Sequence, residues 1–119
     1  GVAVMVAHVM HLGLDPERPA SLSPKVIGDL LRGDLGFDGV VVTDSIDMRA
    51  IADAWSPEGA AVEAVRAGAD LVVDAFNLTP GREHPAPSIV AALREAIDAT
   101  RVAESVERLE RLREQIQRT

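Results

Sequence analysis

The sequence predicts an α/β fold built on a parallel sheet, and three observations support this prediction. Short apolar runs alternate with segments of helical periodicity along the chain, as in parallel strands joined by helical crossovers. Apolar residues make up 47% of the 119 residues but aromatic residues only 3%, so the core must consist of Val, Leu, Ile and Ala. The run Val-Val-Val-Thr at 40–43 is apolar on both faces, which fits a strand buried between layers.

The first strand–helix unit fills the first third of the chain. An apolar run at Val2–Ala7 predicts a strand that leads to His8, and a turn-rich stretch follows at Gly13–Ala20. Ser-Pro at 23–24 then predicts a helix start, with Ser as the N-cap and Pro at the first helical position. Gly33 is placed to end this helix.

The second and third units repeat the pattern. We expect a strand at Val40–Thr43, a short helical segment around Ile46–Ala54, and a helix from Glu58 to Ala67 that Ser-Pro at 56–57 caps and Gly68 stops. The same signals predict the third unit. It begins with a strand at Asp70–Val73 and a loop with prolines at 80, 85 and 87. A helix capped by Ser88 then runs to about Ala99, and an amphipathic helix at Val102–Gln117 ends the chain.

Ionisable residues follow each of the three predicted strands. These residues are His8, Asp44 and Asp74. The carboxyl ends of parallel strands meet at one rim, which is where α/β folds place reactive groups. The sequence therefore predicts a polar pocket at this rim, with Asp44 as its leading acid. Two alternatives stay open: Asp44 could cap the next helix unless Asp47 does so, and His8 could simply hold a loop.

Composition and missing motifs exclude several classes of function. The net charge is −7 with both signs scattered, so we expect no nucleic-acid partner and no membrane partner. No apolar run approaches the roughly 18 residues of a membrane span. There is no cysteine, no Gly-x-Gly-x-x-Gly, no phosphate loop and no Gly-x-Ser-x-Gly. His8 and His11 lack a His-Glu-x-x-His frame, so we predict neither a metal site nor a cofactor.

Several segments together resemble glycoside hydrolase family 3, in particular its β-N-acetylhexosaminidase-like and β-glucosidase-like members. The quoted stretches cover most of the chain, and they are Val-Met-Val-Ala-His-Val at 4–9, Leu-Asp-Pro-Glu-Arg-Pro-Ala-Ser-Leu-Ser-Pro at 14–24, Leu-Leu-Arg-Gly-Asp-Leu-Gly-Phe-Asp-Gly-Val-Val-Val-Thr-Asp at 30–44, Ala-Gly-Ala-Asp-Leu at 67–71 and Val-Ala-Glu-Ser-Val-Glu-Arg-Leu at 102–109. The resemblance implies a partial (β/α)8 TIM-type barrel, made of about its last three βα units and a C-terminal helix. Residues 1–119 would then be the C-terminal portion of an incomplete catalytic barrel domain.

The resemblance also implies a retaining glycosidase that acts on β-glucosides or β-N-acetylglucosaminides. Asp44 matches the family's catalytic nucleophile. His8 matches a position that lines the sugar subsite, and Ser45 would face the rim of that subsite, so both are predicted to bind substrate. The partner that the resemblance implies is a carbohydrate. The family's sugar-gripping Lys-His segment and its acid/base are not found in these 119 residues, since Glu58, Glu63 and Glu83 lie at loop or helix positions.

A second interpretation belongs to another class of protein. Because the chain begins at Gly1 already within a predicted strand, we expect it to start inside a larger domain. Three parallel strands leave two unpaired edges, which favour pairing with another chain. The alternative is therefore a non-catalytic βα module that self-associates through its exposed sheet edges or binds a sugar or protein partner.

Overall fold

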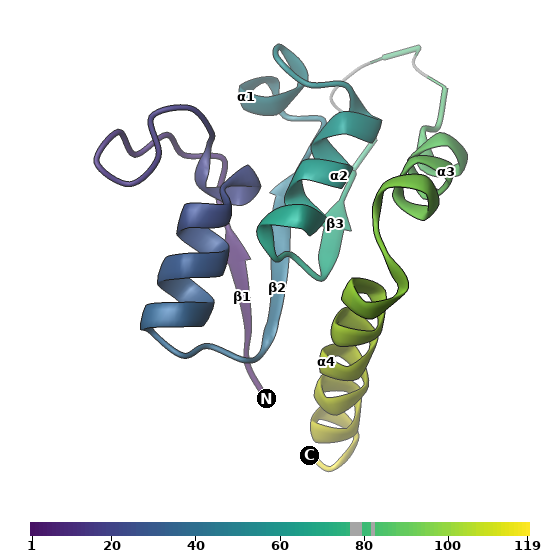
Figure 1. Cartoon of the computed structure of the whole chain (residues 1–119). Helices are drawn as coiled ribbons and strands as arrows, with labels where there is room; N and C mark the ends of the chain where they lie inside the picture. The colour runs from purple at the N-terminus through teal and green to yellow at the C-terminus, as the bar shows by residue number, and fades with distance from the viewer. Residues whose placement is uncertain (77–79, 82) are drawn as a thin grey trace.

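Three parallel strands form one sheet, as a computed structural model of the chain shows (Figure 1). The structure describes residues 1–76, 80–81 and 83–119. The strands are β1 (Ala3–Val6), β2 (Val40–Ser45) and β3 (Leu71–Val73), in the order β1-β2-β3. Each strand lies within a residue or two of its predicted position. Part of the predicted loop before Ser88, at 77–79 and 82, lies outside the described residues.

Helical segments separate and follow the strands, as the alternating pattern predicts. In chain order they are the 3-10 turn η1 (Ala20–Leu22), the π-helix η2 (Lys25–Asp34), α1 (Arg49–Ala52), α2 (Pro57–Ala67), α3 (Ala86–Ala96) and α4 (Ala99–Gln117). The α/β class is therefore confirmed. In the described ranges, no helix is both long and apolar enough to cross a membrane.

One predicted helix start is wrong. Ser88 does not cap α3: it lies inside the helix, where its Oγ is 2.9 Å from the Pro85 carbonyl oxygen. The N-cap is Pro85, three residues earlier than predicted, because Pro at the first turn needs no hydrogen-bond partner for its nitrogen. Asp98 instead caps the next helix, α4, by accepting from the Arg101 N–H at 2.8 Å.

The sheet is covered unevenly. Helices η2 and α2 lie on one face (Figure 1), and small residues of α2 let this helix approach the strands closely, with Ala60 and Ala64 fully buried. On β1, Val4 and Val6 face this core, whereas Met5 between them points to the opposite face and is 60% exposed. One face of the sheet is thus packed and the other is largely open.

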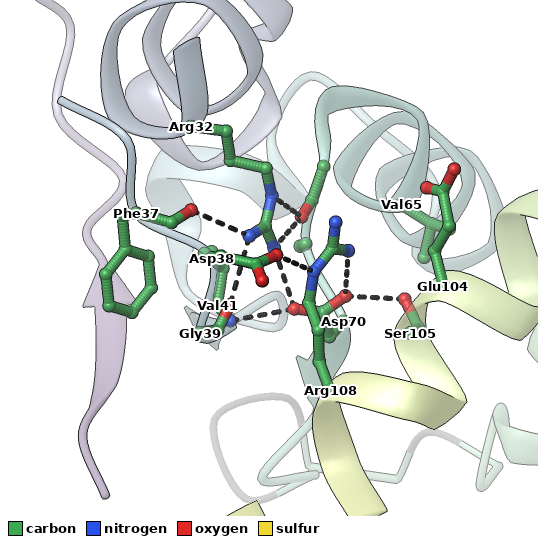
Figure 2. Close-up of polar contacts among 12 residues, drawn as sticks. Arg32, Phe37, Asp38, Gly39, Val41, Val65, Asp70, Glu104, Ser105 and Arg108 are labelled. Atoms are coloured by element: carbon green, nitrogen blue, oxygen red, sulfur yellow. Dashed lines mark hydrogen bonds and ion pairs between the residues drawn. The ribbon is translucent and has the colours of Figure 1, made fainter. Parts of the chain in front are cut away.

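A buried acid ties the last helix to the start of the sheet. The Asp70 side chain is fully buried, and Figure 2 shows Arg32 and Arg108 converging on it from η2 and α4. Its carboxylate accepts from Arg32 Nη2 at 2.8 Å, Ser105 Oγ at 2.6 Å and the Val41 N–H at 2.9 Å. A buried carboxylate is tolerated only when paired and hydrogen-bonded in this way. This cluster lies at the end of the sheet opposite to Asp44.

Candidate active site

The end of β2 presents Asp44 beside an irregularity in the sheet. Burial alternates along the strand: Thr43 and Ser45 are buried, whereas Asp44 between them is partly exposed. Pairing with β3 shifts register between Val42 and Ser45. Such bulges commonly re-aim a side chain next to an active site. The strand therefore ends by turning an acid out of an otherwise buried run.

One oxygen of the Asp44 carboxylate is held by the backbone. Asp44 Oδ1 accepts a hydrogen bond from the Ser45 N–H at 2.8 Å. Within the described ranges, Oδ2 accepts no hydrogen bond and the carboxylate forms no ion pair. The helix-capping alternative for Asp44 is therefore not realised, because the N-cap of α1 is Met48 and no N–H of this helix donates to the Asp44 carboxylate. The geometry leaves one carboxylate oxygen available to a ligand.

Ser45 forms several hydrogen bonds at this rim. Its Oγ donates to Asp47 Oδ1 at 2.6 Å and accepts from the Ala75 N–H at 2.8 Å. The next residue, Ile46, donates its N–H to the Val73 carbonyl at 2.8 Å. Ser45 and Asp47 are 8% and 3% exposed. These bonds tie Ser45, the last residue of β2, to the end of β3 and to the segment that follows it.

His8 connects the end of β1 to the same residue. Its Nε2 lies 2.8 Å from the Ser45 carbonyl oxygen, and its Nδ1 lies 2.6 Å from Ser21 Oγ. The fold therefore brings two of the three strand-end residues to the backbone of Ser45, His8 at its carbonyl and Asp44 at its N–H. The third, Asp74, accepts from the Phe76 N–H through Oδ1 at 3.0 Å. Direct contact of His8 or Ser45 with a substrate stays a prediction.

The loop after His8 is held in place by a buried acid. Asp15 is 2% exposed and accepts from Ser23 Oγ at 2.6 Å and from the N–H groups of Glu17 and Arg18. The Ser23 hydroxyl and these N–H groups lower the pKa of Asp15 below its ordinary value. The loop that carries Ser21 toward His8 is therefore anchored rather than free.

Other ionisable side chains lie away from this rim. A cavity of about 910 Å³ lies between α2 and α3 and is lined by Trp55, Glu58 and Glu63, but by none of the three predicted site residues. Among the residues that the structure describes, no three His, Asp or Glu side chains gather as a metal site would require. We take the strand-end rim as the candidate site because the predicted residues His8, Asp44 and Ser45 lie together there.

Sequence reasoning missed two features of this site. Ser21 carries no motif of its own, and only the fold brings it to His8, thirteen residues away. The register shift in β2 likewise leaves no trace in a run of Val and Thr. Both depend on tertiary contacts, which hydrophobic periodicity does not report.

Comparison with known proteins decides the family. The model of the glycosyl hydrolase family 3 N-terminal domain matches residues 1–117. The chain belongs to glycosyl hydrolase family 3. The resemblance read from the sequence is thereby confirmed.

Relatives of known sequence carry hexosaminidase names. Beta-hexosaminidase A of Pseudoalteromonas piscicida is 36% identical over 81 residues, covering 59% of this chain and 14% of that protein. The beta-hexosaminidase of Stenotrophomonas maltophilia strain K279a is 45% identical over 71 residues, covering 60% and 21%. The chain thus spans about a seventh to a fifth of the length of these relatives.

Solved structures agree in fold. A family 3 beta-N-acetylglucosaminidase from Paenibacillus sp. str. FPU-7 aligns with a TM-score of 0.81 at 40% identity, covering 94% of this chain and 22% of that one. The Beta-N-acetylhexosaminidase of Beutenbergia cavernae DSM 12333 aligns with a TM-score of 0.77 at 35% identity, covering 92% and 32%.

Proposed function

We propose that this family 3 chain supplies the catalytic nucleophile, Asp44, of a retaining glycosidase. The observation that carries the proposal is the state of its carboxylate: one oxygen is bound by the Ser45 N–H, and the other accepts no hydrogen bond from the described residues. The side chain is partly exposed at the end of a buried strand. A nucleophile needs this combination of a fixed direction and an accessible oxygen.

The chemistry proceeds in two displacements. An oxygen of the Asp44 carboxylate forms a bond to the anomeric carbon, while the bond from that carbon to the leaving oxygen breaks and the leaving oxygen takes up a proton. Water, deprotonated by the conjugate base of that donor, then attacks the same carbon and releases Asp44. Two inversions return the sugar with its original β configuration.

The mechanism also needs a proton donor, which is a different group from Asp44. Retaining hydrolysis places the two carboxyl groups, or their equivalents, about 5 Å apart. We assign the donor to a part of the enzyme beyond these 119 residues, because Glu58 and Glu63 line a cavity between α2 and α3 instead. In this proposal the chain is the C-terminal portion of a (β/α)8-type barrel domain, and the remaining strands pair with its open sheet edges.

The substrate class follows from the relatives. Two of the most similar proteins are named beta-hexosaminidases, and two similar structures are a beta-N-acetylglucosaminidase and a Beta-N-acetylhexosaminidase. We therefore favour β-N-acetylhexosaminides, such as β-N-acetylglucosaminides, over β-glucosides. Measuring turnover of an aryl β-N-acetylglucosaminide and of an aryl β-glucoside by the same protein tests this preference directly.

The test of the nucleophile is Asp44→Asn in the complete gene product that carries these residues. We expect turnover of an aryl β-N-acetylglucosaminide to fall by at least about 10³-fold, because an amide cannot attack the anomeric carbon. Asp34→Asn is the matched control, since this exposed acid at the end of η2 has the same chemistry and no described ion pair. Unchanged turnover in Asp44→Asn would overturn the assignment.

A further inference from the structure

The two ring nitrogens of His8 are both committed within the protein. The Ser45 carbonyl oxygen can only accept, so His8 Nε2 must carry a proton and donate it across 2.8 Å. In the neutral ring, Nδ1 is then the acceptor, and Ser21 Oγ donates to it across 2.6 Å. A sugar hydroxyl would have to displace one of these bonds to reach a ring nitrogen.

The residue that His8 holds is the one that orients Asp44. The Ser45 N–H donates to Asp44 Oδ1, while the Ser45 carbonyl accepts from His8. The Ser45 side chain is fixed independently by Asp47 and by the Ala75 N–H. A shift of the Ser45 backbone would therefore turn the Asp44 carboxylate, and His8 is the side chain that opposes such a shift from the β1 side.

We propose that His8 is a positioning residue that acts on Asp44 through the Ser45 backbone, and that Ser21 in turn fixes the His8 ring. This inference rests on the proposed function of Asp44. It replaces the direct sugar contact that the family resemblance implies for His8. The series Ser21–His8–Ser45–Asp44 joins η1, the end of β1 and the end of β2 in one set of hydrogen bonds.

Burial explains why the two partners of His8 need it. Ser21 is fully buried and Ser45 is 8% exposed, so water does not readily replace the ring. An apolar side chain at position 8 would leave the Ser21 hydroxyl without its described partner and the Ser45 carbonyl with only the Met48 N–H, at 3.2 Å. Losing such a partner is costly for buried groups. A Gln at this position places an N–H₂ group near the original Nε2, whereas Asn reaches only the Nδ1 position.

The experiment compares three His8 variants in the complete gene product, with Asp44→Asn measured in parallel. For His8→Leu we expect kcat on an aryl β-N-acetylglucosaminide to fall about 10- to 100-fold with KM nearly unchanged, because a misplaced nucleophile slows the chemical step. His8→Gln should recover most of the lost kcat, since it restores a donor to the Ser45 carbonyl. His8→Asn should recover much less.

A spectroscopic measurement adds a readout that does not depend on turnover. In imidazole ¹H–¹⁵N spectra of the protein, we expect His8 to be the Nε2–H tautomer with a slowly exchanging ring proton. Exposed His11 is the internal comparison, and its ring proton should exchange rapidly. A His8 ring that exchanges as fast as that of His11 would contradict the contacts on which the proposal rests.

The outcomes separate the two proposals. If Asp44→Asn is inactive but His8→Leu matches the wild type, the positioning role is overturned and the nucleophile stands. If His8→Leu and His8→Gln both raise KM with kcat unchanged, His8 is a sugar ligand and the positioning role is also overturned. If Asp44→Asn retains full turnover, the proposed function itself fails. Should His8→Leu not fold, the difference between Gln and Asn carries the same test.

Discussion

Asp44 differs from the two buried acids Asp70 and Asp15 in how its two oxygens are used. Asp70 and Asp15 each accept several hydrogen bonds from surrounding groups, and their role is to hold segments together. Asp44 accepts one, from the N–H of the adjacent Ser45. A carboxylate that stabilises a fold uses all its acceptor capacity, whereas one that reacts must keep some of it. This contrast separates the proposed nucleophile from the structural acids.

A prediction at the residue scale concerns Gly68, which ends α2 with φ of +123°. A Cβ there would lie 2.9 Å from Ile27 Cγ2, in the packed core. We expect Gly68→Ala to lower the free energy of unfolding by about 2 to 4 kcal/mol, from backbone strain and overpacking together. Urea denaturation of the chain measures the change.

The matched control is Gly36→Ala. Gly36 also has positive φ, +67°, but nothing lies within 4 Å of the Cβ position. Gly36→Ala should therefore lower the free energy of unfolding only through backbone strain, by about 1 kcal/mol. Equal losses at the two positions would show that packing against Ile27 contributes nothing.

At the scale of elements, the sequence predicts the strands and the middle helix well. The helix at 57–67 has an apolar pattern, a Ser-Pro start and a Gly stop, and all three signals act locally: Ser56 Oγ accepts from the Gly59 N–H at 3.0 Å, and Gly68 follows the last turn. The strand at 40–45 is equally clear, because an apolar run of β-branched residues has few other stable conformations.

The helices in the last third are less predictable for a physical reason. The sequence signals placed one helix from Ser88 to about Ala99, but α3 ends at Ala96 and α4 begins at Ala99. Asp98 caps α4, so the break between the helices depends on this residue. From sequence alone, an Asp at this position is equally compatible with an acid on the surface of a continuous helix. No residue of α3 or α4 is fully buried, and a weakly buried helix gives a weak periodic signal.

The candidate site was predictable in part. The position of Asp44 after a buried strand follows from local sequence. Its closeness to the strand-end residue His8 could also be predicted, because parallel strands end at one rim. The hydrogen bonds of Ser21, Ser45 and Ala75 could not be predicted, since they join segments between 13 and 37 residues apart.

The whole molecule has an asymmetry that bears on its assembly. Helices pack on one face of the sheet, whereas Met5 and Leu71 on the other are 60% and 42% exposed. Within the described residues, β1 and β3 each have β2 as their sole neighbour, so both outer edges of the sheet are open. Open edges and an apolar face together favour association with further strands.

We therefore expect the 119-residue chain by itself to self-associate. Sedimentation equilibrium should give a weight-average mass above the monomer value of 12.6 kDa that rises with concentration. Met5→Lys, which places a charge on the open face, should reduce the association without altering the packed face. A strict monomer with sharp amide spectra at all concentrations would contradict this expectation, because it would mean that the open surfaces need no partner.

The most direct test of the central claim is to trap the covalent intermediate. The complete gene product is treated with an activated, fluorinated β-N-acetylglucosaminide that slows hydrolysis of the glycosyl-enzyme, and the labelled peptide is sequenced by mass spectrometry. We expect one sugar per chain, attached to the Asp44 carboxylate and absent from Asp44→Asn. A label on another acid, or turnover that never passes through a bound sugar, would contradict the role proposed for Asp44.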